Sequence, residues 1–534
     1  MTTPARIVVA DPLHEAGLRL LEASGAELVQ VGAGEKERLP ALLGDADALV
    51  VRSGTKVTAE LLRAGKRLRV VGRAGIGVDN VDVEAATALG VLVVNAPTAN
   101  LIAATEHTWA LLLALARNVA AADAAMKREE WDRKRFLGRE LQGKILGVVG
   151  FGRIGQQVAR RAHSFDMQVV AYDPFLDSSV AERWDVELAA LDDVLSRADV
   201  VTLHTPLTEQ TRNLIDAAAL ARMRPGALLV NCARGGVVDE EALLAALDEG
   251  RLGGAALDVF AVEPPQSWRL ACHPRVVATP HIGAQTKEAQ ERVATETARM
   301  VLAALDGSLA VTAVNLPFTD AGAHGEPYLR LGEQLGRLAS TLLGGSLKRV
   351  EVGLWGLEDE LRVPVSVAVL RGALLSFLGE AVNYVNAEGV AASRGIEVVR
   401  ATHRGGSDYP HLVEVRLAGE AGEVELAGSL LRERDPRVVR FRGFPLEFKP
   451  SGLLLVVVNQ DVPGVVGKLG TLLGQAKVNI ADIHLARRRG TDEAMAVLRL
   501  DQEPPADALE ALRALPEVEE ARVIDLRTAQ GARE

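Results

Sequence analysis

The chain has 534 residues, too many for one hydrophobic core, so it should fold as roughly three or four domains. Its composition, 48% hydrophobic and 25% charged with only 4% aromatic residues, is that of a soluble globular protein. The net charge of −11 argues against a nucleic-acid-binding surface, while two cysteines, no apolar run of membrane-span length and no signal-peptide pattern favour a cytoplasmic protein without membrane contact.

Residues 1–98 repeat a short apolar run followed by a helical pattern. The runs lie about twenty residues apart, at 6–10, 27–31, 48–51, 69–73 and 92–95. This alternation predicts an open parallel sheet, in which ligands gather at the carboxyl ends of the strands. Arg52 and Arg73 stand at two such ends with glycines beside them, so we expect them to bind an anionic substrate. The alternative is a pair of surface arginines.

A strongly apolar segment at 101–127 predicts one helix that is buried on more than one side, and a subunit interface is one way to bury it. His107 lies in this segment and is interpreted as a core or interface histidine rather than a catalytic one. The segment that follows is basic and includes Arg133. It is interpreted either as a solvated charged face or as an arm that reaches an anion.

Residues 144–173 carry the motif around which the chain is organised. A strand pattern leads into Gly150-Phe-Gly152-Arg-Ile-Gly155, a helical pattern opens there, and a second apolar run ends at Asp173. The three glycines would allow the tight turn, the approach of a pyrophosphate and close helix–strand packing, and the helix N-terminus would bind the phosphates. Asp173 would accept hydrogen bonds from the adenosine ribose and repel a 2′-phosphate, which predicts NAD rather than NADP. A glycine-rich turn in an ordinary βα unit is the alternative, and it leaves Asp173 unexplained.

The strand–helix alternation continues beyond this motif. Further apolar runs lie at 199–204, 227–231, 254–258 and 276–279, and each ends in polar residues. They predict a second doubly wound unit over about 99–283. A helix from Gln285 to about Leu305 is long enough to return to the first unit.

Arg234, Glu263 and His281 form the candidate catalytic set in this second unit. A dehydrogenase acting on a hydroxy acid needs a base for the hydroxyl proton, and histidine suits because its pKa lies near working pH. A carboxylate beside it would favour the imidazolium and fix the tautomer. A guanidinium would bind the substrate carboxylate through two hydrogen bonds. For His281 alone, a structural role is the alternative.

Several motifs together resemble the D-isomer-specific 2-hydroxyacid dehydrogenases over the first 315 residues. They are VVGRAGIGVDNVD, GVVGFGRIGQQVA, HTPLTEQTRNLI, NCARGGVVDEEAL, GAALDVFAVEPP and TPHIGAQTKEAQ. Within the family the chain is similar to the long-form members that use NAD to oxidise 3-phospho-D-glycerate (3-phosphoglycerate) to 3-phosphohydroxypyruvate, the first step of L-serine biosynthesis. The alternatives are a relative acting on glyoxylate or hydroxypyruvate, and a non-catalytic NAD-sensing binding protein of the same fold.

The resemblance also implies roles for individual residues. His281 would be the proton donor and acceptor, Glu263 its partner and Arg234 the clamp on the substrate carboxylate. The cofactor would be held by Gly150, Gly152, Arg153, Ile154, Gly155, Asp173, Thr205, Cys232, Ala233, Arg234, Asp258, His281, Ile282, Gly283 and Ala284. The substrate would be bound by Arg52, Arg73, Asn100 and Arg133, the last from a neighbouring subunit of a homotetramer. No metal site is predicted.

The remaining residues follow a Pro/Gly-bearing linker at Asn315–Pro327. Strand-like runs and a helix near 370–392 resemble the intervening domain of the long-form enzymes, including the segment Asn383–Ala387. From Leu453 the pattern βαββαβ predicts a ferredoxin-like domain that resembles the ACT domain, a sensor of small amino acids. The resemblance implies L-serine as an effector, bound between paired domains. The residues expected to bind it are Asn459, Asp461 and Asn479.

The expected fold class is therefore α/β, with two doubly wound parallel-sheet domains of Rossmann and flavodoxin type, an α+β intervening domain and a ferredoxin-like ACT domain. The expected boundaries are 1–98 for the substrate-binding domain, with 284–315 returning to it, 99–283 for the NAD-binding domain, 316–450 for the intervening domain and 451–534 for the regulatory domain.

Overall fold

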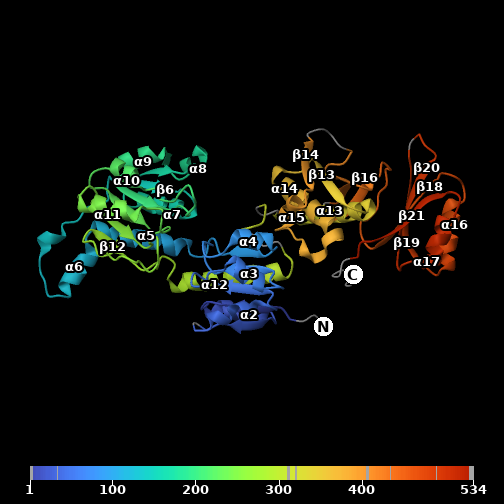
Figure 1. The fold of residues 1–534 in the computed structure, drawn as a ribbon. Helices are drawn as coiled ribbons and strands as arrows, with labels where there is room; N and C mark the ends of the chain where they lie inside the picture. Colours follow the sequence, from blue (N-terminus) through green and yellow to red (C-terminus); the bar gives the residue numbers. More distant parts are fainter. Residues whose placement is uncertain are drawn as a thin grey trace.

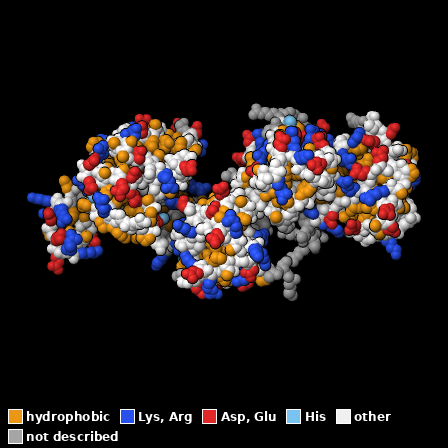
Figure 2. Space-filling model, in the orientation of Figure 1, with side chains coloured by type: hydrophobic (Ala, Val, Ile, Leu, Met, Phe, Trp, Pro, Cys, Tyr) orange, Lys and Arg blue, Asp and Glu red, His pale blue; other side chains and the backbone are white. Residues whose placement is uncertain are grey.

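The computed structural model describes residues 4–32, 34–308, 313–318, 322–403, 408–432, 434–488 and 490–527 of the chain. In this part of the chain four β-sheets follow one another, each with its own helices, and we call these units the first to fourth lobes (Figure 1). Figure 1 shows the second lobe at one end of the molecule, the first lobe beside it, and the third and fourth lobes at the other end. Acidic and basic side chains are interspersed over the face shown in Figure 2.

The first lobe is a parallel sheet in the order β2-β1-β3-β4-β5. Its strands are β1 (Arg6–Val9), β2 (Glu27–Gln30), β3 (Ala48–Val51), β4 (Val70–Arg73) and β5 (Leu92–Asn95). The helices between them are α1 (Glu15–Ala23), η1 (Lys36–Arg38), α2 (Leu39–Leu43), α3 (Ala59–Ala64) and α4 (Val83–Ala88). Each strand coincides with one of the apolar runs expected from the sequence, because strands covered on both faces need apolar side chains throughout.

The second lobe is a parallel sheet in the order β12-β11-β10-β9-β6-β7-β8. Its strands are β6 (Ile145–Val149), β7 (Gln168–Tyr172), β8 (Glu187–Leu188), β9 (Val200–Leu203), β10 (Leu228–Asn231), β11 (Gly254–Leu257) and β12 (Val276–Ala278). The helices are α7 (Arg153–His163), α8 (Ser178–Glu182), α9 (Leu191–Arg197), α10 (Ala217–Arg222) and α11 (Glu240–Asp248). The strand order reverses between β6 and β9, the point at which open α/β sheets bind ligands.

The apolar segment at 101–127 forms two helices, so the single helix expected there is wrong. Between α5 (Leu101–Ala116) and α6 (Val119–Met126) the chain bends by 65°. Asn118 has φ 55, a left-handed conformation that a right-handed helix cannot continue. As a result α5 packs on the second sheet, whereas α6 projects away from it, followed by the short helix η2 (Arg133–Phe136) (Figure 1).

The long helix α12 (Lys287–Leu305) crosses from the second lobe back to the first. Ala298 and Val301 on this helix are fully buried and belong to the same apolar cluster as Ile7 and Val50 of the first sheet. Apolar packing of α12 against the first sheet therefore returns the chain to the first lobe, as the sequence predicts.

The third lobe is a mixed sheet in the order β14-β13-β15-β16-β17, in which β13 and β14 are parallel and the other pairs antiparallel. Its strands are β13 (Leu347–Trp355), β14 (Glu397–His403), β15 (Leu412–Gly419), β16 (Gly422–Leu431) and β17 (Asp435–Phe441). The helices are α13 (Gly322–Leu343), α14 (Asp359–Leu378), η3 (Gly379–Ala381) and α15 (Ala387–Ser393). The single helix expected near 370–392 is wrong, because Gly379 has φ 60 and ends α14. Part of the expected linker, 319–321, lies outside the described residues, and α13 begins within the linker at Gly322.

Helix α14 is long and apolar enough to cross a membrane by length and composition, which corrects the expectation that no such run exists. Most of its side chains are buried in the third lobe, Val365, Val369 and Leu370 among them. They share one apolar cluster with Leu335 of α13. The length and apolarity of α14 are therefore explained by its place as a core helix.

The fourth lobe is an antiparallel sheet in the order β19-β20-β18-β21. Its elements are β18 (Leu453–Gln460), α16 (Val465–Gln475), β19 (Ile480–Arg487), β20 (Glu493–Leu500), α17 (Ala506–Arg513) and β21 (Val518–Asp525). Leu469 and Leu512 of the two helices pack on one face of the sheet. From the other face, Val456 and Met495 join the core of the third lobe, so these two lobes share a continuous apolar core.

The C-terminal half contacts the turn that precedes β5 in the first lobe. Nδ2 of Asn383 donates to the carbonyl oxygen of Gly90 at 2.6 Å. Asn315, at the end of the dehydrogenase half, accepts from the amide of Val93 at 2.8 Å and donates to the carbonyl oxygen of Val91 at 2.9 Å. One turn of the first lobe therefore anchors both the connection to the C-terminal half and the third lobe itself.

Candidate active site

The glycine loop after β6 lies at the carboxyl edge of the second sheet. Gly150 has φ 91, which glycine adopts without strain. A Cβ on Gly155 would lie 2.2 Å from the carbonyl oxygen of Gly150, so α7 could not approach the strand this closely with a larger residue. A Cβ on Gly152 would meet no described atom within 4 Å, so open space lies beside this residue. Helix α7 begins there with Arg153 and Ile154. The space and the helix N-terminus together suit a phosphate.

Asp173 stands at the end of β7, beside this loop. Its Oδ2 accepts from the amide of Phe151 at 2.9 Å, and its Oδ1 accepts from the amide of Phe175 at 3.0 Å. Each oxygen keeps a further lone pair, because a carboxylate oxygen can accept two hydrogen bonds. The side chain is thus fixed in place and still able to accept from a ribose diol.

Two buried polar atoms near these strand ends have no hydrogen-bond partner among the described residues. They are Oγ1 of Thr205, just after β9, and Oδ1 of Asn100, at the start of α5. Buried polar atoms are nearly always paired in folded proteins, so an orphaned pair points to a ligand that completes them. Together with the phosphate space and Asp173, Thr205 fits a dinucleotide lying along this edge.

The turns after β10 and β12 lie at the same edge of the sheet. The first holds Cys232 and Ala233, and the second holds Ile282, Gly283 and Ala284. Burial and the nearby carboxylate of Asp258 raise the pKa of Cys232 to about 12. Cys232 therefore stays a neutral thiol and can line a cofactor without reacting with it.

His281 and Glu263 form a hydrogen-bonded pair. Nδ1 of His281 lies 2.7 Å from Oε2 of Glu263, whose Oε1 accepts from the amide of Phe260 at 3.1 Å. The hydrogen bond to Glu263 raises the pKa of His281 against the effect of burial. Burial raises the pKa of Glu263, but the hydrogen bonds from His281 and Phe260 outweigh it and lower the pKa. Glu263 is thus ionised at neutral pH, and His281 can take up and release a proton at Nε2.

Another histidine at a strand end cannot serve as the base. Burial lowers the pKa of His204 to about 3, and its Nε2 lies 3.0 Å from Oγ1 of Thr202. A base must become protonated near neutral pH, so His281 is the histidine suited to the role.

Arg234 reaches from the second lobe to the first. Its Nε donates to Oδ2 of Asp79 at 3.0 Å and its NH1 donates to the carbonyl oxygen of Ala233 at 2.7 Å. A Cβ on Gly77 would lie 1.9 Å from NH2 of Arg234, so the loop after β4 leaves room for the guanidinium there. This ion pair joins the two lobes at the carboxyl edges of both sheets.

Arg73 and Arg52 lie on the first-lobe side of the same cleft. Burial and the charge of Arg234 lower the pKa of Arg73 to about 10, and Arg52 contributes in the same direction. Three guanidinium groups therefore stand close enough to repel one another. Asn80 fixes the loops that carry them, since its Nδ2 donates to the carbonyl oxygens of Arg52 and Thr55, at 2.6 Å each. Such a cluster suits a substrate with more than one negative charge.

Arg133 does not join this cluster within one chain. It is exposed and lies in η2, after the projecting helix α6. Contact with a substrate in this cleft would have to come from a second subunit, as the sequence resemblance implied.

Sequence reasoning missed Asp79 and Asn80, although both stand in the motif VVGRAGIGVDN from which Arg73 was chosen. The rule that ligands gather at strand ends identified the arginine but not the residues six and seven positions later, of which Asp79 pairs with Arg234 and Asn80 contacts Arg73. A carboxylate and an amide in a glycine-rich loop after a strand were the available signal.

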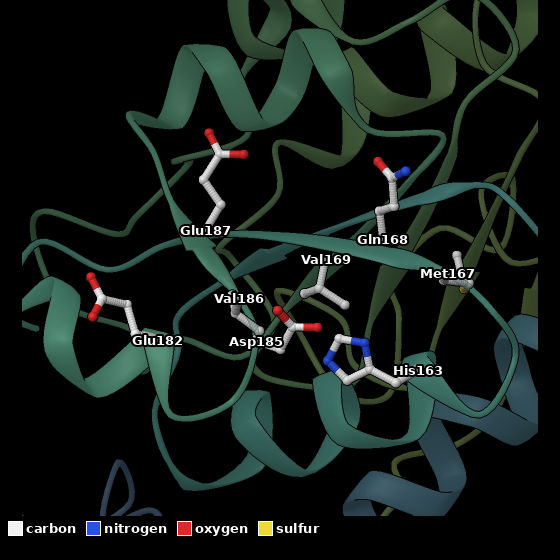
Figure 3. Close-up of a pocket in the computed structure, with 8 residues that line it drawn as sticks. All are labelled: His163, Met167, Gln168, Val169, Glu182, Asp185, Val186 and Glu187. Atoms are coloured by element: carbon white, nitrogen blue, oxygen red, sulfur yellow. The ribbon is translucent and has the colours of Figure 1, made fainter.

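The hollow in Figure 3 is separate from this site. It has a volume of about 450 Å³ and lies at the amino end of β7, with a lining of His163, Met167, Gln168, Val169, Glu182, Asp185, Val186 and Glu187. The glycine loop and Asp173 lie at the opposite end of the same sheet. Arg197 already binds Glu187 through two hydrogen bonds of 2.6 Å, so the acidic lining is partly neutralised.

The structure separates the residues expected to bind an effector in the fourth lobe. Asn459 is buried and its Nδ2 donates to the carbonyl oxygen of Gln460. Asp461 pairs with Arg487 at 2.9 Å, and Asn479 donates to Oδ2 of Asp501 at 2.6 Å. Because β18 and β19 both run antiparallel to β20, Asp461 and Asn479 lie at opposite ends of the sheet. Within one chain these two residues therefore do not face each other.

Comparison with known families matches three parts of the chain. The NAD-binding domain of the D-isomer-specific 2-hydroxyacid dehydrogenases matches residues 109–283. The intervening domain of D-3-phosphoglycerate dehydrogenase matches residues 325–442, and the ACT domain matches residues 453–517. These matches and the four sheets confirm the expected fold class and the expected cofactor, NAD.

The similar proteins cover either nearly the whole chain or a little more than half of it. A D-3-phosphoglycerate dehydrogenase of Methanocaldococcus jannaschii is 41% identical over 98% of this chain and 100% of its own length. Among solved structures, the TT0316 protein of Thermus thermophilus covers 58% of this chain and 99% of its own, with 37% identity and a TM-score of 0.54. D-lactate dehydrogenase of Aquifex aeolicus, solved with NAD and lactic acid, covers 58% of this chain and 98% of its own, with 28% identity and a TM-score of 0.52.

Proposed function

Since the chain belongs to the D-3-phosphoglycerate dehydrogenase family, we propose that its site residues oxidise 3-phosphoglycerate at C2 to 3-phosphohydroxypyruvate. The protein is an NAD-dependent oxidoreductase, and this reaction is the first step of L-serine biosynthesis. The observation that carries the residue assignment is the His281–Glu263 pair, which stands at the edge of the second sheet, where Arg234 pairs with Asp79 of the first lobe.

In the proposed mechanism His281 is the base. Glu263 holds the Nδ1–H of His281, which leaves the lone pair on Nε2 to accept the proton of the C2 hydroxyl. The glycine loop, Asp173 and Thr205 would hold NAD, which when bound would supply the acceptor for the hydride from C2. The imidazolium that forms is stabilised by the ionised Glu263. In the reverse direction the same nitrogen returns the proton to the carbonyl oxygen.

Arg234 binds the substrate carboxylate and turns the C2 oxygen toward His281. Asp79 holds Nε of Arg234, so the two terminal nitrogens are oriented while the group keeps its charge. The carboxylate would then accept charge-assisted hydrogen bonds from the guanidinium. Arg73, buried beside Arg234, adds positive charge to the same subsite.

The phosphate distinguishes 3-phosphoglycerate from other 2-hydroxy acids, and Arg52 is the residue we assign to it. We expect Arg52→Ala to lower kcat/KM for 3-phosphoglycerate by roughly 10- to 100-fold, since a hydrogen bond to a charged group contributes about 1.5–3 kcal/mol. Within the part of the chain that the structure describes, the Arg52 side chain makes one long hydrogen bond, of 3.4 Å to the carbonyl oxygen of Pro12, so the fold should tolerate the change.

The measurement is a substrate panel followed by NADH absorbance, with 3-phosphoglycerate, D-glycerate, D-lactate and, in reverse, glyoxylate and hydroxypyruvate. Activity of Arg52→Ala on D-glycerate should equal that of the wild type, because this substrate has no phosphate to lose. Equal wild-type activity on D-glycerate and 3-phosphoglycerate would contradict the assignment of the substrate.

We propose that the protein is a homotetramer in the cytoplasm. Two separate surfaces expose large apolar side chains: the arm after α5, with Met126, Trp131 and Leu137, and the edge strand β19, with Ile483 and Leu485. Two different self-complementary surfaces on one chain build a tetramer with dihedral symmetry. The arm interface would bring Arg133 to the neighbouring active site. Cys232 and Cys272 are both free thiols, as a reducing compartment keeps them.

L-serine is the proposed effector, and its site would need two copies of the fourth lobe. β19 has eight residues and spans roughly 25 Å, which is too far for one amino acid to bridge Asp461 and Asn479 of the same chain. Two β19 edges paired antiparallel would place Asp461 of one chain near Asn479 of the other. The carboxylate would then bind the ammonium of serine and the amide its carboxylate.

We therefore expect L-serine to inhibit the intact enzyme. Asn479→Ala should lose most of this inhibition, because an effector acts only by binding the active and inactive states with different affinities, and the variant removes a residue that binds it. Initial rates over a range of L-serine concentrations measure it, with D-serine as the ligand control. Gln502→Ala is the matched variant, since Gln502 lies near Asn479 and donates to the carbonyl oxygen of Lys477 at 3.0 Å. If L-serine never inhibits the wild type, the fourth lobe serves only to assemble subunits.

A further inference from the structure

His107, on the helix α5, contacts two residues beside the catalytic base, Asp258 and Thr279. Its Nε2 lies 3.1 Å from Oδ1 of Asp258 and 3.0 Å from Oγ1 of Thr279. Oγ1 of Thr279 in turn donates to Oδ1 of Asp258 at 2.6 Å. Asp258 follows β11 and Thr279 follows β12, so one side chain of α5 joins the ends of two neighbouring strands.

Asp258 connects this cluster to the residues around the catalytic base. Its Oδ1 accepts from the amide of Ile282 at 2.9 Å and its Oδ2 from the amide of Gly283 at 2.8 Å. Its carbonyl oxygen accepts from the amide of His281 at 2.9 Å. Three successive amides of the loop are therefore fixed by a single aspartate.

The backbone of His281 depends on these contacts. His281 has φ 54, a left-handed conformation that costs a residue with a side chain free energy and persists where its surroundings enforce it. The hydrogen bonds of Asp258 to both sides of His281 supply that enforcement. They set the direction in which the imidazole leaves the chain, and with it the position of Nε2.

The carboxylate of Asp258 in turn depends on His107. Its side chain is almost completely buried, and an ionised carboxylate needs hydrogen bonds to each oxygen in such a place. Burial raises the pKa of Asp258, but the hydrogen bonds from His107, Thr279 and Ile282 outweigh it and lower the pKa. A Cβ on Gly283 would lie 3.0 Å from Oδ2 of Asp258 and 3.8 Å from Cδ2 of His107, so His107 and the loop enclose the carboxylate from two sides.

We propose that His107 is a positioning residue for the dehydrogenase reaction: through Asp258 it holds the loop 279–284, so that His281 and the nicotinamide end of NAD keep their mutual geometry. The proposal rests on the proposed function, in which His281 is the base, and on the cofactor contact that the sequence resemblance implies for residues 281–284. It also assigns α5 a role beyond filling the core, since Asn100, which the sequence resemblance assigns to the substrate, precedes the helix, and His107 on the helix contacts Asp258 and Thr279.

The test compares His107→Phe, which keeps a ring but removes Nε2, with His107→Gln, whose amide nitrogen can still reach Asp258. We expect kcat to fall roughly tenfold or more in the phenylalanine variant, because a hydrogen bond to a buried charge is lost. KM for 3-phosphoglycerate should change little, since the substrate arginines lie elsewhere. The primary isotope effect with substrate deuterated at C2 should rise, because hydride transfer becomes slower relative to product release. Glutamine should restore part of the rate.

Binding gives a readout that does not depend on catalysis. We expect the dissociation constant of NAD to rise about three- to tenfold in His107→Phe, which corresponds to the free energy of one hydrogen bond. The dissociation constant of ADP-ribose should stay unchanged, because ADP-ribose lacks the nicotinamide. Titration of tryptophan fluorescence measures both ligands. Glu106→Ala, an exposed position on the same helix, is the control and should match the wild type in every measurement.

The outcomes separate this proposal from the proposed function. A phenylalanine variant with wild-type kcat, isotope effect and NAD affinity overturns the positioning role, as does equal weakening of NAD and ADP-ribose. If that variant does not fold, Thr279→Val removes the other side-chain donor to Asp258 and should give the same pattern. A wild type inactive on the whole substrate panel contradicts the proposed function, while the comparison of NAD with ADP-ribose still decides the role of His107.

Discussion

His281→Ala is expected to lower kcat roughly 10²- to 10⁴-fold, the usual cost of losing a general base, and to leave NAD binding nearly intact. The base acts only in the transition state, whereas the cofactor would be held by the glycine loop, Asp173 and Thr205. Stopped-flow measurement of NADH formation and titration of NAD binding test the two halves of this expectation separately.

His163→Ala is a matched control for this variant. His163 is also a histidine of the second lobe, but it lines the hollow at the other end of the sheet and lies 3.0 Å from the carbonyl oxygen of Trp184. Its loss should leave kcat unchanged. Retention of more than half of the wild-type kcat by His281→Ala would show that another group takes the hydroxyl proton.

Glu263→Gln should both slow the reaction and move its pH dependence. The hydrogen bond to Glu263 raises the pKa of His281, so removing the charge lowers that pKa. Oxidation needs neutral His281 and therefore rises with pH through this pKa, while reduction needs the imidazolium and falls through it. Both midpoints should move to lower pH in the variant, and at neutral pH reduction should lose more rate than oxidation. We expect a loss of roughly 10- to 100-fold in reduction, a part of the contribution that a general acid makes to the rate.

Profiles of kcat/KM against pH in both directions provide the measurement, because they report the ionisations of the free enzyme. Glu240→Gln is a suitable control: Glu240 accepts from the amide of Ala261, in the same segment, but does not contact His281. Midpoints that stay in place in Glu263→Gln would mean that another group sets the pKa of His281.

The sequence predicts the two parallel sheets well because their signals are local. Strands such as Ala48–Val51 and Leu228–Asn231 are covered on both faces and so read as continuous apolar runs. The glycine loop is equally local, since the turn at Gly150 and the close approach at Gly155 each demand glycine. Arg234, Glu263 and His281 follow from the rule that ligands gather at the carboxyl ends of parallel strands.

The rest depends on contacts between distant residues. Asp79 meets Arg234, and His107 meets Asp258, across more than 150 positions, and no spacing in the sequence encodes such a meeting. The third lobe was poorly predicted because its strands alternate in burial and its helix α14 includes Pro364, which resembles a helix boundary. In the fourth lobe the elements were recognisable, yet the separation of Asp461 and Asn479 follows only from the strand directions.

The hydrogen bond between Asn383 and Gly90 connects the third lobe to the amino edge of the first sheet. Gly90 lies in the turn before β5, at the amino edge of the first sheet, whereas Arg52 and Arg73 stand at or just beyond its carboxyl edge. A displacement of the third lobe would therefore act on the amino edge of this sheet and move its carboxyl edge as well. Such a movement would shift Arg52 and Arg73 relative to His281 without changing the shape of either group. Regulation by such a movement would change the width of the cleft and the affinity for substrate, and would leave the cofactor residues of the second lobe in place.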